Sequence, residues 1–108
     1  MADDAPVLVY STFPNTASAR AAAGVLVRKK LAACVNMIPG MRSIYTWADK
    51  VEEENEIVFI AKTMQSRAEE VMATIGEYHP YDEPALLVLH TSGGSRSFCD
   101  WIEKQVAQ

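Results

Sequence analysis

The sequence has little of what marks a secreted, membrane-spanning or zinc-binding protein. It contains two cysteines, Cys34 and Cys99, and neither a CxxC nor an HExxH motif, which disfavours a disulfide framework and a zinc site built by one chain. Its longest apolar runs, such as residues 85–89, are far shorter than the roughly 20 residues of a membrane-spanning helix. Met1 and Ala2 are followed by two aspartates where a signal peptide would be basic, so we expect a cytoplasmic protein with no membrane partner.

Positive charge and catalytic motifs are also scarce. Lys and Arg total 10 against 14 Asp and Glu, which gives a formal net charge of -4. The basic residues are scattered rather than striped, so we expect no nucleic-acid partner. The chain has no phosphate-binding loop and no nucleophile-elbow motif, so no enzyme is predicted.

What the chain does have is the composition of a globular domain. Hydrophobic residues make up 49% and charged residues 22% of it, which argues against disorder. A chain of 108 residues is expected to form one core, so we predict a single domain over residues 1–108, with residues 1–6 as a flexible lead.

Hydrophobic periodicity and capping signals predict four strands and three helices. The strands are expected over residues 7–13, 32–38 continuing past Pro39–Gly40 into 42–47, 54–63 and 84–90, with a hairpin turn at 48–50. The helices are expected from Asn15 or Thr16 to about Lys30, from a Ser66–Glu69 capping box to Tyr78, and from a cap at Ser97 onward. This β-α-β-β-α-β order with a C-terminal helix predicts an α+β fold of the ferredoxin-like, split βαβ type.

The predicted sheet has one apolar face more than its helices can cover. Two helices cover one face of a four-stranded sheet. In the third strand Phe59 points to one side while Val58 and Ile60 point to the other, so both sides are apolar. Covering the second face requires another copy of the chain. We therefore predict an oligomer, with Trp47, Val58 and Ile60 in its interface.

His79 is the candidate metal ligand. It follows a predicted helix and precedes Asp82 and Glu83, and a histidine beside carboxylates suits a divalent cation. The alternative is that His79 ends the helix and forms only local hydrogen bonds.

A second candidate is a cleft between subunits lined by Tyr45, Lys62 and Tyr81. Lys62 would place a positive charge over bound anions. The alternative interpretation has Lys62 ending in solvent at the rim of the sheet.

Several segments together resemble the divalent-cation-tolerance (CutA) family. They are residues 31–36, 38–40 and 43–47, Lys62–Thr63, His79-Pro80-Tyr81 and Trp101–Ile102. The resemblance spans nearly the whole chain from Val7. It implies a ferredoxin-like homotrimer similar to the nitrogen-regulatory PII signalling proteins, tolerance of copper and other divalent metals, and no enzymatic activity.

The resemblance also implies three metal-ligand positions, of which one carries over. His79 matches the family histidine, whereas Ser11 and Ala85 stand where the family has a cysteine and a glutamate. Asp82 and Glu83 would have to ligate from other backbone positions. No cofactor is obligatory, and Cu²⁺ or another divalent cation is the candidate ligand. The alternative function is a PII-like sensor of small molecules or anions that bind between subunits.

Overall fold

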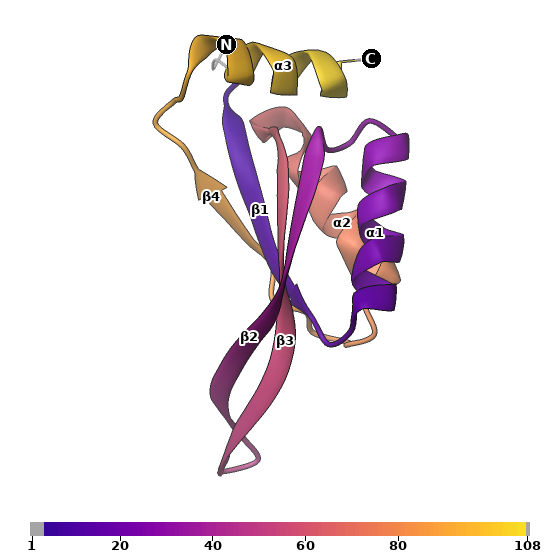
Figure 1. Ribbon diagram of the computed structural model, residues 1–108, viewed down its shortest axis with the longest axis vertical. Coiled ribbons are helices and arrows are strands. Elements are labelled where there is room, and N and C mark those ends of the chain that lie inside the picture. The colour runs from indigo at the N-terminus through magenta and orange to yellow at the C-terminus, as the bar shows by residue number, and fades with distance from the viewer. Residues whose placement is uncertain (1–3, 108) are drawn as a thin grey trace.

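The computed structural model describes residues 4–107, which form one four-stranded antiparallel sheet with three α-helices (Figure 1). The strand order is β2-β3-β1-β4. The elements along the chain are β1 (Pro6–Phe13), α1 (Thr16–Arg28), β2 (Cys34–Trp47), β3 (Lys50–Met64), a 3-10 turn η1 (Gln65–Arg67), α2 (Ala68–Tyr78), β4 (Leu87–His90) and α3 (Arg96–Val106). The predicted α+β element order, with its C-terminal helix, is confirmed.

The core lies between the sheet and the helices α1 and α2, which pack on the same face (Figure 1). Alternate residues of β1 and β3, such as Val9 and Phe59, point to this face and are fully buried. Leu26 of α1 and Ile75 of α2 meet them from the helical side. α1 begins as predicted, because the Asn15 side chain accepts a hydrogen bond from the Ser18 N–H at 2.8 Å.

β2 and β3 form a long hairpin whose far half, residues 41–56, projects beyond the helices (Figure 1). We call this segment the hairpin arm. Its turn is formed by Ala48 and Asp49, both with positive φ, so β3 begins at Lys50 and not at the predicted residue 54. The interruption predicted at Pro39–Gly40 is a bulge between Ile38 and Met41, and Gly40 has a φ of 84° there.

Two predicted caps are wrong. Ser66 does not cap α2 but lies in η1, where its N–H and hydroxyl both donate to the Asp4 carboxylate. α3 starts at Arg96 after Ser95, so Ser97 lies inside the helix. The Ser66–Glu69 pattern failed because a carboxylate distant in the sequence provides the acceptors.

The chain ends and the last strand also differ from the prediction. Pro6 already belongs to β1, and Asp4 is held by Ser66, while residues 1–3 of the predicted lead lie outside the described residues. β4 covers only residues 87–90 of the predicted 84–90, since Pro84 has no N–H for a strand ladder. Among residues 4–107, no helix is both long and apolar enough to cross a bilayer.

Candidate functional site

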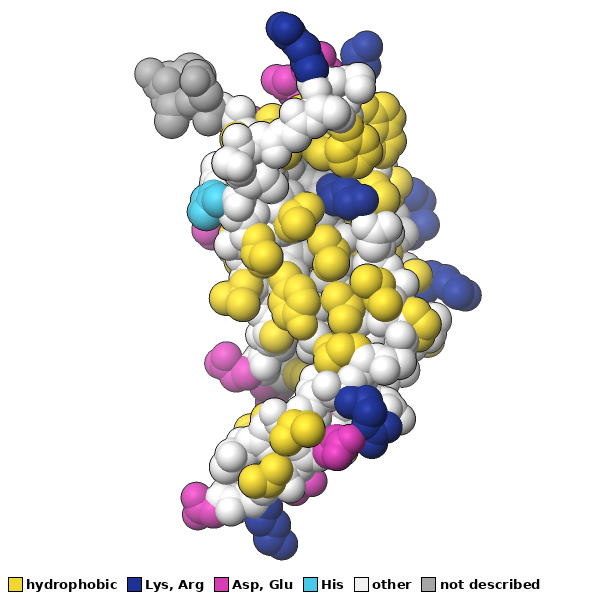
Figure 2. Space-filling model, turned by 60° about the vertical axis from the view of Figure 1, so that its left-hand side comes forward, with side chains coloured by type: hydrophobic (Ala, Val, Ile, Leu, Met, Phe, Trp, Pro, Cys, Tyr) yellow, Lys and Arg dark blue, Asp and Glu magenta, His cyan; other side chains and the backbone are white. Residues whose placement is uncertain are grey.

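The face of the sheet away from α1 and α2 is apolar and accessible (Figure 2). Strand pairing sets the side chains of neighbouring strands next to one another on this face. We call it the open face and define it by Leu8, Tyr10, Ile38, Val58, Ile60, Leu87 and Leu89. Leu87 is 62% exposed, and Val58 and Ile60 are half-buried. The predicted second apolar face is therefore present.

The hairpin arm carries a second group of exposed apolar side chains. Trp47 is 71% exposed, and Ile44 and Val51 are similarly open. Ile44 and Val51 lie on one side of the arm and Trp47 on the other. Trp47 thus lies at the tip of the arm, far along the hairpin from Val58 and Ile60, and all three predicted interface residues present apolar surface.

His79 forms hydrogen bonds with the end of β1 and with its own loop. The residue is 8% exposed, and its ring lies 4.3 Å from the Phe13 ring, centroid to centroid. Nδ1 accepts a hydrogen bond from the Tyr81 N–H at 3.1 Å. Nε2 must then carry the proton and donate to the Thr12 carbonyl oxygen at 2.6 Å. Both ring nitrogens are occupied, so a metal would have to displace one of these hydrogen bonds.

The other candidate metal positions do not converge on His79 within one chain. Asp82, Glu83 and Ala85 are exposed on the loop before β4. Ser11 is fully buried on the helix-covered face, and its hydroxyl has no hydrogen-bond partner. Among residues 4–107, no three His, Cys, Asp or Glu side chains are grouped as a metal site requires. The predicted ligand positions of a single subunit therefore do not form a divalent-cation site.

A buried carboxylate at the base of the hairpin arm was missed by the sequence analysis. Glu56 follows three consecutive glutamates at residues 52–54, an acidic pattern typical of a solvated surface, yet it is only 9% exposed. Its carboxylate accepts a hydrogen bond from the Thr12 hydroxyl at 3.2 Å. The sequence does carry a sign of this burial, because strand alternation places Glu56 on the same face as the apolar residues Val58 and Ile60.

Two of the three predicted cleft residues gather near Glu56. Burial, followed by the charges of Glu56 and Glu54, raises the pKa of Tyr81. Desolvation, with Glu54, Tyr81 and further glutamates, raises the pKa of Tyr45. The two phenols therefore keep their protons to a higher pH than an ordinary tyrosine does.

Lys62 lies at the opposite end of β3. Tyr45 pairs with Glu52, which is ten residues from Lys62 along the strand, or roughly 33 Å. The Lys62 ammonium instead lies 5.5 Å from the centre of the Phe98 ring, which stacks on Trp101. One chain thus does not assemble the predicted cleft of Tyr45, Lys62 and Tyr81.

Residues 7–105 match the family model described as "CutA1 divalent ion tolerance protein". The chain belongs to this family. It is 38% identical over 96 residues to the divalent-cation tolerance protein CutA of Pectobacterium atrosepticum, covering 89% of this chain and 87% of that protein. It is also 38% identical over 97 residues to the chloroplastic CutA protein of Arabidopsis thaliana, covering 90% of this chain but only 53% of the plant protein. The chain therefore spans about half the length of that relative.

Solved CutA1 structures share the whole fold. The crystal structure from Oryza sativa has a TM-score of 0.92 at 33% identity and covers 96% of this chain and 95% of its own. The structure from Ehrlichia chaffeensis has a TM-score of 0.92 at 27% identity and covers 99% and 100%. CutA1 family membership thus rests on the sequence and the fold together.

Proposed function

We propose that the chain acts in tolerance of divalent metal ions as a non-enzymatic homotrimer of PII-like architecture. The proposed role in metal tolerance rests on the match of residues 7–105 to the CutA1 divalent ion tolerance model. The open face supports the assembly, because Ile60, Leu87 and their neighbours would gain burial only against another copy. Burying each such side chain contributes roughly 1.5–3 kcal/mol.

Direct binding of Cu²⁺ or a related cation is the finer part of the proposal. One subunit brings no three ligands together, so the ion would be held near a subunit boundary with ligands from more than one copy. His79 is the proposed anchor, and it would exchange its contact with Thr12 or Tyr81 for the metal. Asp82 and Glu83 are exposed and lie within four residues of it.

The cytoplasm is the proposed compartment. The PII-like sensor is the weaker alternative, because Lys62 lies far along β3 from the partner of Tyr45. Only a neighbouring copy would bring Lys62 near a Tyr45–Tyr81 pair. No observation within one chain favours that arrangement over a metal response.

Metal titration tests the binding proposal. Calorimetry with metal-free protein should show Cu²⁺ or Zn²⁺ binding that is lost in His79→Gln, whereas His90→Gln, which changes a histidine on β4, should bind normally. Binding that survives His79→Gln, or no heat with either ion, would refute a site at His79.

Growth of a copper-sensitive bacterial strain tests the broader function. Expression of the chain in a strain that lacks its own CutA should restore growth in medium with an inhibitory concentration of copper. Failure to restore growth, with folded protein present in the cells, would count against metal tolerance whatever the titration shows.

A further inference from the structure

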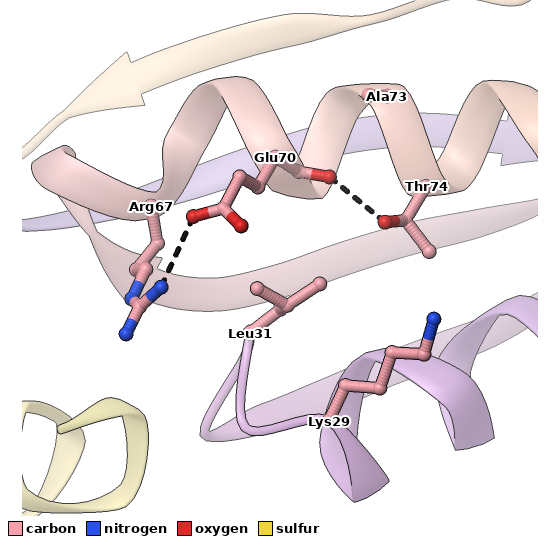
Figure 3. Close-up of a pocket in the computed structure, with 6 residues that line it drawn as sticks. All are labelled: Lys29, Leu31, Arg67, Glu70, Ala73 and Thr74. Atoms are coloured by element: carbon pink, nitrogen blue, oxygen red, sulfur yellow. Dashed lines mark hydrogen bonds and ion pairs between the residues drawn. The ribbon is translucent and has the colours of Figure 1, made fainter. Parts of the chain in front are cut away.

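A groove lies in the helical layer, between the end of α1 and the first half of α2 (Figure 3). It is an open hollow of about 540 Å³ lined by Lys29, Leu31, Arg67, Glu70, Ala73 and Thr74. This volume falls in the range of small-molecule sites. Because α1 and α2 cover the other side of the sheet, the groove stays accessible when copies meet through the open face.

Two cations border the groove in different ways. The Lys29 side chain extends from the end of α1 toward α2 (Figure 3), and within residues 4–107 it forms no ion pair. Arg67 is held in place, since its side chain is 16% exposed and donates to Glu70 at 3.0 Å and to the Val106 carbonyl at 3.2 Å.

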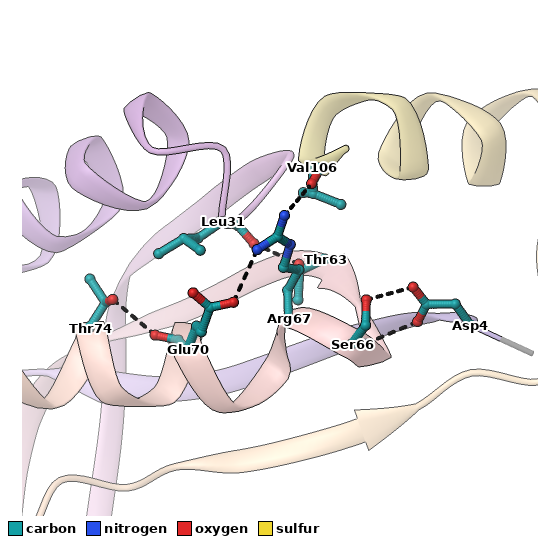
Figure 4. A network of polar contacts seen from close by, with 8 residues as sticks. All are labelled: Asp4, Leu31, Thr63, Ser66, Arg67, Glu70, Thr74 and Val106. Atoms are coloured by element: carbon teal, nitrogen blue, oxygen red, sulfur yellow. Dashed lines mark hydrogen bonds and ion pairs between the residues drawn. The ribbon is translucent and has the colours of Figure 1, made fainter. Parts of the chain in front are cut away.

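The contacts of Arg67 leave it able to bind another oxyanion. A guanidinium has five N–H donors, and the two contacts within residues 4–107 use two of them. Figure 4 shows Arg67 between Glu70 and the end of α3, in a network that also fixes Ser66 through Asp4. The cation is therefore positioned before any ligand arrives, which lowers the entropy lost on binding.

Leu31 and Ala73 form the apolar part of the groove lining. Leu31 is buried, and its carbonyl oxygen accepts a hydrogen bond from the Thr63 hydroxyl at 2.6 Å. Ala73 contributes a methyl group from α2. A fully inorganic ion would leave the exposed part of these two side chains in water, whereas a short hydrocarbon chain would cover it.

We propose that this groove binds a small organic anion, a carboxylate with a short apolar chain. The carboxylate would lie between the Lys29 ammonium and the free N–H groups of Arg67. The chain would lie over Leu31 and Ala73. Glu70 competes with the ligand for Arg67, so it sets the affinity of the groove.

A titration with straight-chain carboxylates from acetate to pentanoate, alongside inorganic phosphate, tests the site. Amide chemical shifts of the intact protein at low salt give both the location and the affinity. Shifts should appear at Leu31, Glu70 and Ala73, and affinity should rise from acetate to pentanoate, by at most about fourfold for each added CH₂. Phosphate binding as tightly as pentanoate, shifts centred elsewhere, or no binding would overturn the proposal.

Two matched pairs of variants separate the groove from general surface charge. Lys29→Gln should weaken pentanoate binding at least fivefold, whereas Lys30→Gln, which changes a neighbouring lysine outside the groove, should not. Glu70→Gln should tighten binding several-fold, whereas Glu69→Gln should leave it unchanged. Equal effects within either pair would show that only net charge matters and would refute the site.

This inference is independent of the proposed metal function. The titration contains no metal, and the groove shares no residue with the surroundings of His79. Loss of metal binding in His79→Gln with carboxylate binding intact would separate the two sites.

Discussion

The two faces of the sheet use alternate residues of the same strands, yet their surroundings are opposite. Phe59 is fully buried under the helices, whereas its neighbour Ile60 is half-exposed on the open face. Both are large and apolar, so composition alone does not distinguish them. The difference shows that the chain completes one core by itself and leaves a second apolar face partly exposed.

The largest effect is expected on the covered face. Phe59→Ala removes a fully buried ring that packs 4.8 Å from the Phe13 ring, centroid to centroid. It should lower the free energy of unfolding by about 3–5 kcal/mol, because the cavity cannot collapse fully. Urea denaturation measures this loss. The control is Ala21→Ser on the exposed side of α1, which should change stability by less than about 0.5 kcal/mol.

A charge on the open face should break assembly while sparing the fold. Ile60→Asp places a carboxylate at the centre of this face, opposite Tyr10 and Asn36. Sedimentation should show three copies for the original chain and one for the variant, because an interface cannot bury an unpaired charge cheaply.

The matched control for assembly is Ala21→Asp on α1, which should remain trimeric with the same circular dichroism as the original chain. If the original chain sediments as a monomer at micromolar concentration, the open face is not a subunit interface. That result would leave the open face as an exposed surface.

Periodicity predicted both faces because it depends only on neighbours in the sequence. The alternation of residues 57–61 was enough to place Phe59 on one side and Ile60 on the other. The caps were different, since the hydrogen bonds of Ser66 go to Asp4, 62 residues away. Local pattern rules fail where a distant residue supplies the better acceptor.

The candidate site was predictable only in part for the same reason. His79 does end α2, as the alternative interpretation expected, but only its hydrogen bond with Tyr81 is local, since Thr12 is 67 residues away. The separation of Lys62 from Tyr45 depends on the length and register of the hairpin. β3 begins at Lys50, so the pairing of Tyr45 with Glu52 lies outside the strand predicted from residue 54. The burial of Glu56 likewise depends on Thr12, which is 44 residues away.

The face of the sheet that α1 and α2 cover also contains a destabilising polar group that one substitution should remove. The Ser11 hydroxyl is fully buried without a hydrogen-bond partner among the described residues, and such a group costs about 1–3 kcal/mol. Ser11→Ala should therefore raise the free energy of unfolding by roughly 1 kcal/mol, seen as a higher urea midpoint.

Thr63→Val is the matched opposite of Ser11→Ala. Thr63 is equally buried, but its hydroxyl donates to the Leu31 carbonyl at 2.6 Å. Its loss leaves that carbonyl without a partner and should lower stability by about 1–3 kcal/mol. The same sign of change in both variants would show that burial alone, and not hydrogen bonding, sets these energies.

The smallest expected effect lies within the hairpin arm, where Tyr45 pairs with Glu52 on the side of the open face. Desolvation and the charge of Glu54 raise the pKa of Tyr45, so the native state holds the phenolic proton more tightly than the unfolded chain does. The stabilisation is complete below the unfolded pKa of about 10 and is lost as the pH rises through the folded value. Alkaline titration of tyrosinate absorbance, with Tyr45→Phe subtracted, follows this group. Glu54→Gln should lower the pKa of Tyr45, whereas Glu53→Gln, on the other side of the arm, should leave it unchanged. An unchanged value in Glu54→Gln would show that the charge of Glu54 does not contribute to the raised pKa of Tyr45.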